Sequence, residues 1–153
     1  MGDQAEIRQI LVANDHAGVE FKAQLRSSSS LKDVTFVDLG VFETTSVDYP
    51  DVAVTLAEKM KNMPNALGLL ICGSGIGVSM AANRFSYIRA ALCHDVTTAR
   101  LARQHNDANV LVMGARTTGI QTAIDMILAF MSEPFEGGRH QRRVDKLNHL
   151  TNK

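Results

Sequence analysis

Short hydrophobic runs recur along the chain and alternate with longer segments of mixed polarity. Runs rich in valine, isoleucine and leucine are typical of strands buried on both faces of a sheet, and we predict five such strands. The segments that follow the strands carry apolar residues at helical spacing or begin after a glycine, so we predict that they are helices. The predicted strands are residues 7–14, 34–38, 69–71, 88–93 and 110–113, and the predicted helices are residues 19–26, 51–61, 78–83, 96–104 and 117–131.

This alternation of strands and helices predicts an α/β fold with a five-stranded parallel sheet. Helices should cover both faces of the sheet through right-handed crossovers, which makes a Rossmann-like three-layer sandwich. At 153 residues the chain fits a single domain. The tail from about residue 134 breaks the alternation, with a glycine pair and then a predicted helix that has little apolar surface. We expect this tail to fold back over the site or to pack on a partner subunit.

The segment 68–83, GLLICGSGIGVSMAAN, is predicted to run from a buried strand through a glycine-rich turn into a helix. Glycine lets the backbone turn sharply and lets a ligand approach, so Gly73, Gly75 and Gly77 should leave several N–H groups around a space that suits an anion. Cys72 lies at the edge of this loop, where oriented amides and a helix N-terminus favour a thiolate. A small apolar filler is the ordinary alternative for such a cysteine. We expect instead that the loop is the reaction centre and that Cys72 is its base.

Other polar residues lie where predicted strands or helices end. Asp15 and His16 follow the first strand and Arg116 follows the last, while His105 and Asn106 end a helix. Ligands gather at the carboxyl ends of parallel strands, so we expect these residues to lie near the glycine loop at one edge of the sheet. A surface turn at 15–16 and a helix cap at 105–106 are the simpler alternatives.

Three features have simpler structural explanations. The serine run 27–30 is predicted to be a polar loop. Asp48 and Pro50 suit the start of a helix, which is about as good an explanation as a functional one. Cys93 lacks a glycine loop, so we expect it to pack in the core.

Composition excludes several classes of protein. Sixteen basic and sixteen acidic residues leave no net charge, so nucleic acid is not an expected partner. No apolar run approaches the roughly 20 residues that span a bilayer, and the N-terminus lacks a signal-peptide pattern, so we expect no membrane partner and a cytoplasmic location. The two cysteines have neither disulfide-framework nor zinc-site spacing, which fits a reducing compartment and predicts no metal. The glycine spacing lacks the lysine of a P-loop and the full dinucleotide pattern, which leaves nucleotide binding as a weaker alternative.

Seven short motifs, taken together and in order, resemble a known family. They are DHAG (15–18), DYPD (48–51), ICGSGIG (71–77), AANR (81–84), RQHNDAN (103–109), GAR (114–116) and GGRHQRRV (137–144). The set resembles the type B ribose-5-phosphate isomerases, in the family that includes the galactose-6-phosphate isomerase subunits, and the similarity extends from Ile7 to about Leu147. It implies an aldose–ketose isomerase that interconverts ribose 5-phosphate and ribulose 5-phosphate through a cis-enediol, without metal or coenzyme. It also implies a homodimer or homotetramer whose active sites take residues from two subunits.

The same resemblance implies a role for each matching residue. Cys72 corresponds to the base, His105 to the ring-opening acid and base, and Ser74 to a hydroxyl that assists ring opening where many members carry threonine. Substrate contacts are implied for Asp15, His16, Gly73, Gly75, Ile76, Gly77 and Asn106, and anion binding is implied for Arg116, Arg139 and Arg143. Some members use a glutamate in place of the cysteine, and residues 76–80 contain none, which favours Cys72. His140 and Arg142 adjoin the arginines, and we expect them to be solvated.

Isomerisation needs one base that moves a proton between C2 and C1 and donors where the oxyanion develops, which the glycine loop can supply. Two alternatives stay open. One is an isomerase of a six-carbon aldose phosphate such as allose or galactose 6-phosphate. The other is a non-catalytic module that binds a sugar phosphate or a nucleotide.

Overall fold

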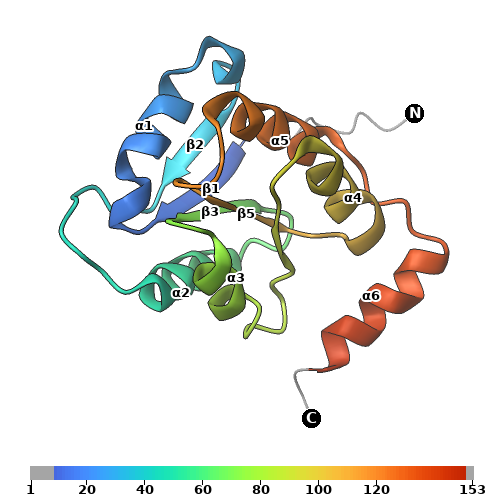
Figure 1. Cartoon of the computed structure of the whole chain (residues 1–153). Coiled ribbons are helices and arrows are strands. Elements are labelled where there is room, and N and C mark those ends of the chain that lie inside the picture. The colour runs from blue at the N-terminus through green and yellow to red at the C-terminus, as the bar shows by residue number, and fades with distance from the viewer. Residues whose placement is uncertain (1–8, 151–153) are drawn as a thin grey trace.

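The apolar run Leu67–Cys72 forms the central strand β3 of a parallel sheet, and all of its residues are buried. The computed structural model describes residues 9–150. In it, β1 (Gln9–Asn14) and β5 (Val110–Gly114) pair with the two sides of β3, while β2 (Thr35–Asp38) and β4 (Ala90–Leu92) form the outer strands. All four pairings are parallel, in the order β2-β1-β3-β5-β4 (Figure 1). The predicted five-stranded parallel sheet is confirmed.

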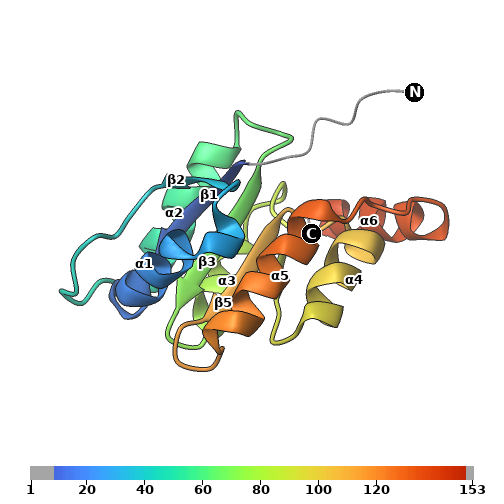
Figure 2. The same ribbon diagram turned by 90° about the horizontal axis from the view of Figure 1, so that it is seen from above.

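Helices cover both faces of this sheet and complete the three predicted layers (Figures 1 and 2). One face carries α1 (Val19–Ser27), α4 (Val96–Asn106) and α5 (Ile120–Ser132), and the other carries α2 (Tyr49–Met60) and α3 (Ile76–Ala82). Successive residues of a strand point to opposite faces, which is why buried strands need apolar residues at every position.

The residues of β3 show this division directly. Leu69 and Ile71 belong to the core shared with α1, α4 and α5, whereas Leu70 and Cys72 belong to the core shared with α2 and α3. The continuous apolar pattern of the predicted strand therefore serves two separate cores.

Element boundaries differ from the sequence prediction by a few residues, and one local prediction needs correction, whereas Asp48 and Pro50 do lie at the start of α2. Residues 7–8 of the first predicted strand lie outside the described residues. The serine run is not simply a loop, because Ser27 ends α1 and Ser29–Leu31 form a 3₁₀ turn in which the Ser28 hydroxyl accepts the Ser30 N–H. Asp48 stands at the N-cap position of α2 but makes no capping hydrogen bond through its side chain.

The tail forms α6 (Arg139–His149), which follows two glycines with positive φ angles of 66° and 54°. Figure 1 shows α6 beyond α4 and away from the sheet, and only His140 and Val144 of this helix are buried. Packing of α6 on a partner subunit stays a prediction.

Within residues 9–150, no helix combines the length and the apolar character needed to cross a membrane.

The connection between β2 and α2 begins as an extension of the sheet next to the carboxyl end of β1. The Asn14 N–H donates to the Gly40 carbonyl and the Val41 N–H donates back to Asn14, both at 2.8 Å. The buried Lys22 of α1 binds this segment through two hydrogen bonds. Its Nζ lies 2.7 Å from Asp38 Oδ1 and 3.0 Å from the Val41 carbonyl oxygen. A buried lysine is tolerated only with such partners.

The close approach of β5 to the loop after β3 predicts that adding a side chain at Gly114 destabilises the fold. A Cβ at Gly114 would lie 2.6 Å from the Ser74 carbonyl carbon, so Gly114→Ala is expected to lower the free energy of unfolding by about 1–3 kcal/mol. Gly119→Ala is the matched control, because no atom lies within 4 Å of its Cβ. Gly119 is the N-cap of α5, so alanine there should still lower the free energy of unfolding, but by less than about 1 kcal/mol. Urea denaturation measures both variants, and equal losses would contradict this close approach.

Candidate active site

The loop that follows β3 turns the chain into α3 and directs a backbone donor at a thiol. The Cys72 sulfur accepts a hydrogen bond from the Gly75 N–H, with 3.1 Å between Sγ and N. Gly75 has a φ of 78°, in the left-handed region that favours glycine, and a Cβ there would lie 2.6 Å from Leu92 Cδ1. A donor at this distance stabilises negative charge on its acceptor. Cys72 itself is 5% exposed.

Arg116 lies against the same loop. Its N–H donates to the Gly73 carbonyl at 2.9 Å, and a Cβ at Gly73 would lie 3.1 Å from the Arg116 Nη1. The Ser74 hydroxyl accepts the Ile76 N–H at 3.2 Å, which closes the turn into α3. The thiol, the glycine loop and one guanidinium are thus brought together at the carboxyl edge of the sheet.

Asp15 and His16 lie at the same edge, after the neighbouring strand β1. The Asp15 carboxylate accepts the Ala17 N–H at 2.9 Å, and the Asp15 N–H donates to the Ile71 carbonyl of β3 at 3.0 Å. His16 Nδ1 accepts the Val47 N–H at 3.2 Å, so this ring holds the end of the long connection. Asp15 therefore caps a turn, as the simpler explanation proposed, and it does so at the predicted ligand-binding edge.

Tyr49 is a candidate site residue that the sequence reasoning did not select. A Cβ at Gly77 would lie 2.6 Å from two ring atoms of Tyr49, so the ring packs directly on the start of α3. Tyr49 is 44% exposed. The DYPD motif contains this tyrosine, but its Asp48 and Pro50 indicate only a helix start, and helix-capping chemistry gives no sign of an aromatic contact with the glycine loop.

His105 and Asn106 lie at the opposite edge of the sheet, so the expectation that they share an edge with His16 is wrong for a single copy of the chain. The helix α4 leaves the carboxyl end of β4 and returns to the start of β5, where these two residues end it. From Val110 at the start of β5 to Gly114 beside Cys72, the strand rises about 13 Å at about 3.3 Å per residue. Crossover helices always return to the amino edge, which is the physical reason for the error.

The predicted tail arginines also lie away from the glycine loop. Arg139 and Arg143 are one helical turn apart on α6 and are both exposed. Because α6 packs beside α4, these arginines lie on the same side of the molecule as His105 and Asn106. The chain therefore carries two separate groups of predicted site residues, one at each edge of the sheet.

His140 is buried, so the expectation that it is solvated is wrong. It is 7% exposed and its ring stacks on that of His105, with centroids 4.3 Å apart and planes 9° from parallel. Burial lowers the pKa of His140 below its ordinary value, and the neighbouring His105 and Arg139 lower it further. The lowered pKa favours the uncharged form of the His140 ring, which stacks on His105 without adding positive charge.

Glu136 faces both histidines, and the three side chains are a possible metal-binding group. Its Oε2 lies 3.8 Å from Nε2 of His105 and 3.7 Å from Nε2 of His140, and the ligand atoms all lie within 4.8 Å of one another. The distances are compatible both with a carboxylate shared between two imidazoles and with a set of metal ligands.

Comparisons with known proteins identify relatives that match most of the chain. A family described as "Ribose/Galactose Isomerase" matches residues 10–147. Ribose-5-phosphate isomerase B of Escherichia coli is 37% identical over 141 residues, which cover 92% of this chain and 95% of that protein. A Rickettsia bellii protein, named only as a sugar phosphate isomerase, is 45% identical over 138 residues, or 90% of this chain and 96% of its own length. The structure of ribose-5-phosphate isomerase B from Mycoplasma genitalium with bound ribulose-5-phosphate superposes with a TM-score of 0.87 at 41% identity, covering 95% of this chain and 97% of that one.

The chain has a parallel sheet covered by helices, with a glycine loop that contacts a thiol at the carboxyl edge, and these relatives match nearly its whole length. These features together define a sugar phosphate isomerase. The chain belongs to the ribose/galactose isomerase family.

The two cysteines are expected to react differently with iodoacetamide. The thiolate is the reactive form, and burial, with a smaller contribution from the Asp95 carboxylate, raises the pKa of the Cys93 thiol to about 11. Only about 0.1% of Cys93 would then be ionised at about pH 8. Cys72, with its N–H donor, should be alkylated first, as read by peptide mass spectrometry after partial reaction. Equal labelling, or labelling of Cys93 first, would contradict the assignment.

Proposed function

We propose that this chain interconverts ribose 5-phosphate and ribulose 5-phosphate, with Cys72 as the base that moves the proton between C2 and C1. The observation that carries the proposal is the contact between Cys72 Sγ and the Gly75 N–H, in a glycine loop that also touches Arg116. The presence of ribulose-5-phosphate in the structure of the Mycoplasma genitalium relative supports the choice of a five-carbon substrate.

In the open-chain aldose, the Cys72 thiolate takes the C2 proton. The electron pair of that C–H bond forms the C1=C2 double bond while O1 gains a proton, which gives the cis-enediol. The enediol then loses its O2 proton and takes a proton at C1 from the thiol, which gives the ketose and restores the thiolate. The Gly75 and Ile76 N–H groups already donate to Cys72 Sγ and to the Ser74 hydroxyl. We therefore assign the stabilisation of negative charge on the substrate oxygens to the other N–H groups of residues 73–77.

Ribose 5-phosphate is mainly a ring, so a second group must move the ring proton before C2 becomes acidic. We assign this role to His105, because an imidazole is suited to proton transfer near neutral pH, with the Ser74 hydroxyl assisting. The stacked His140 would fix the orientation of the His105 ring. Asp15, His16 and Asn106 would contact the sugar hydroxyls.

We infer that a complete site needs two copies of the chain. Cys72 and His105 lie at opposite edges of one sheet, yet both act on the same small sugar in the proposed reaction. A two-fold pair can place the carboxyl edge of one copy against the amino edge of its partner. Arg116 of one copy and Arg139 and Arg143 of the other would then surround the phosphate dianion, through the paired hydrogen bonds that guanidinium groups form with phosphate.

The first test is hydrogen exchange at C1 of ribulose 5-phosphate in D₂O, followed by NMR, together with turnover of ribose 5-phosphate. Removal of a general base should slow exchange by about 10²–10⁴-fold in Cys72→Ala. Cys93→Ala is the matched control and should keep most of the exchange, since Cys93 is a core residue.

Other outcomes of this test separate the alternatives. Wild-type protein that binds ribose 5-phosphate without converting it would favour a binding module. Faster turnover of allose or galactose 6-phosphate than of ribose 5-phosphate would favour a six-carbon substrate. Exchange that survives in Cys72→Ala would overturn the assignment of the base.

The second test mixes two inactive variants. In a mixed dimer of Cys72→Ala and His105→Asn, one site lacks both groups and the other has both. Random exchange of subunits should therefore restore about a quarter of the wild-type turnover of ribose 5-phosphate. Co-expression with two affinity tags provides the mixed dimers. No recovery in purified mixed dimers would contradict the shared site.

A further inference from the structure

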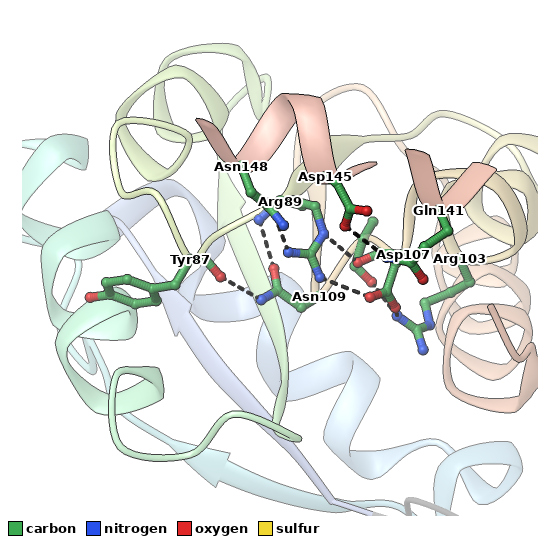
Figure 3. Close-up of polar contacts among 9 residues, drawn as sticks. Tyr87, Arg89, Arg103, Asp107, Asn109, Gln141, Asp145 and Asn148 are labelled. Atoms are coloured by element: carbon green, nitrogen blue, oxygen red, sulfur yellow. Dashed lines mark hydrogen bonds and ion pairs between the residues drawn. The ribbon is translucent and has the colours of Figure 1, made fainter. Parts of the chain in front are cut away.

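Two arginines surround Asp107 at the point where α4 ends (Figure 3). Arg89 Nη2 lies 3.0 Å from Asp107 Oδ2, and Arg103 Nη1 lies 3.0 Å from Oδ1 of the same carboxylate. The two arginine side chains are largely buried, at 20% and 13% exposure. We call these three residues the Asp107 clamp.

The clamp also holds the backbone that leaves the helix. Arg89 Nε donates to the Asp107 carbonyl at 2.8 Å, and Arg103 Nη1 donates to the Ala108 carbonyl at 2.7 Å. Asp107 has φ 45° and ψ 42°, a left-handed conformation that few residues other than glycine, asparagine and aspartate adopt readily. The two guanidinium groups therefore hold both the carboxylate and the backbone of the residue directly after His105 and Asn106.

Arg89 is itself anchored on several sides. Its backbone N–H donates to Asn109 Oδ1 at 2.7 Å, and Asn109 Nδ2 donates to the Tyr87 carbonyl at 2.8 Å (Figure 3). Its Nη1 reaches Asn148 of α6 at 3.4 Å. A cavity of about 390 Å³ beside the clamp is lined in part by Arg89, Asn106 and Asn148. The clamp thus joins the end of α4 to the start of β5 and to α6.

We propose that the Asp107 clamp positions His105 for ring opening, so that the carboxylate acts on catalysis through the last turn of α4. This inference rests on the proposed role of His105. Neutralising Asp107 would leave two guanidinium groups close together with one neutral acceptor between them, and their repulsion would loosen the end of the helix. Cys72 and its loop lie at the other edge of the sheet, so the saturating rate of proton transfer on an open-chain substrate should not depend on the clamp. Any loosening of the phosphate-binding arginines on α6 should instead raise the KM of both substrates.

Ribulose 5-phosphate separates the two steps. Its C5 oxygen is esterified, so the ketose cannot close a furanose ring, and exchange of its C1 proton needs no ring opening. Conversion of ribose 5-phosphate needs both steps. The ratio of the two saturating rates therefore reports ring opening specifically, and a general loss of folding would lower both rates together.

The variants are Asp107→Asn and Asp107→Gly, which keep access to the left-handed conformation and remove the charge. We expect conversion of ribose 5-phosphate to fall at least about 10-fold in both, through misplacement of the acid and base, with C1 exchange within about 3-fold of wild type. Asp125→Asn is the control, because this half-buried carboxylate on α5 accepts a hydrogen bond from Gln121, one turn earlier on the same helix, and both its rates should match wild type. Thermal unfolding and sedimentation would verify that each variant is folded and assembled.

Combination with His105→Asn tests whether the clamp acts through His105. If it does, Asp107→Asn should slow the His105→Asn variant by less than about 2-fold, because residues that act as a unit are not additive. Equal losses of both rates in Asp107→Asn, or wild-type conversion in Asp107→Gly, would overturn the clamp proposal while leaving His105 in place. Equal losses of both rates in His105→Asn would instead overturn the proposed role of His105 and the clamp proposal with it.

Discussion

A helix that joins two parallel strands must carry the chain back to the amino edge of the sheet, and this constraint decides where each candidate group lies. Residues directly after a strand, such as Cys72 and Arg116, emerge at the carboxyl edge. Residues that end a connecting helix, such as His105 and Asn106, emerge at the amino edge. One copy therefore presents two incomplete sets of groups that face away from each other, and this separation is the main support for a site shared between two copies.

At the carboxyl edge, the site depends on the absence of side chains as much as on their presence. The Arg116 guanidinium can lie on the loop because Gly73 has no Cβ, and the loop itself fits against β5 because Gly114 has none. Gly75 takes a conformation that would strain other residues and thereby directs its N–H at the thiol.

The sequence predicted the sheet and the glycine loop because both follow from local patterns. Apolar runs identify buried strands, and three glycines after a strand indicate a backbone that accepts a ligand. It failed where the outcome depends on contacts between elements far apart in the chain. Helical spacing turns His140 away from Arg139 and Arg143 and so predicts a solvated ring, yet α6 lies on α4 and buries that ring on His105. The contact between Tyr49 and Gly77 is not predicted either, because the hydrophobic pattern of neither helix indicates it.

The polar character of α6 explains why specific contacts must hold it. A helix that buries only His140 and Val144 gains little from the hydrophobic effect, so burial alone fixes its position weakly. The His105 stack secures its first turn, and the hydrogen bond from Arg89 to Asn148 secures its last. Both contacts reach α6 from the segment around the end of α4. The positions of Arg139 and Arg143 and the position of His105 therefore depend on the same few polar contacts. A substrate phosphate bound by the α6 arginines and the His105 imidazole on α4 would then be held in a fixed position relative to each other.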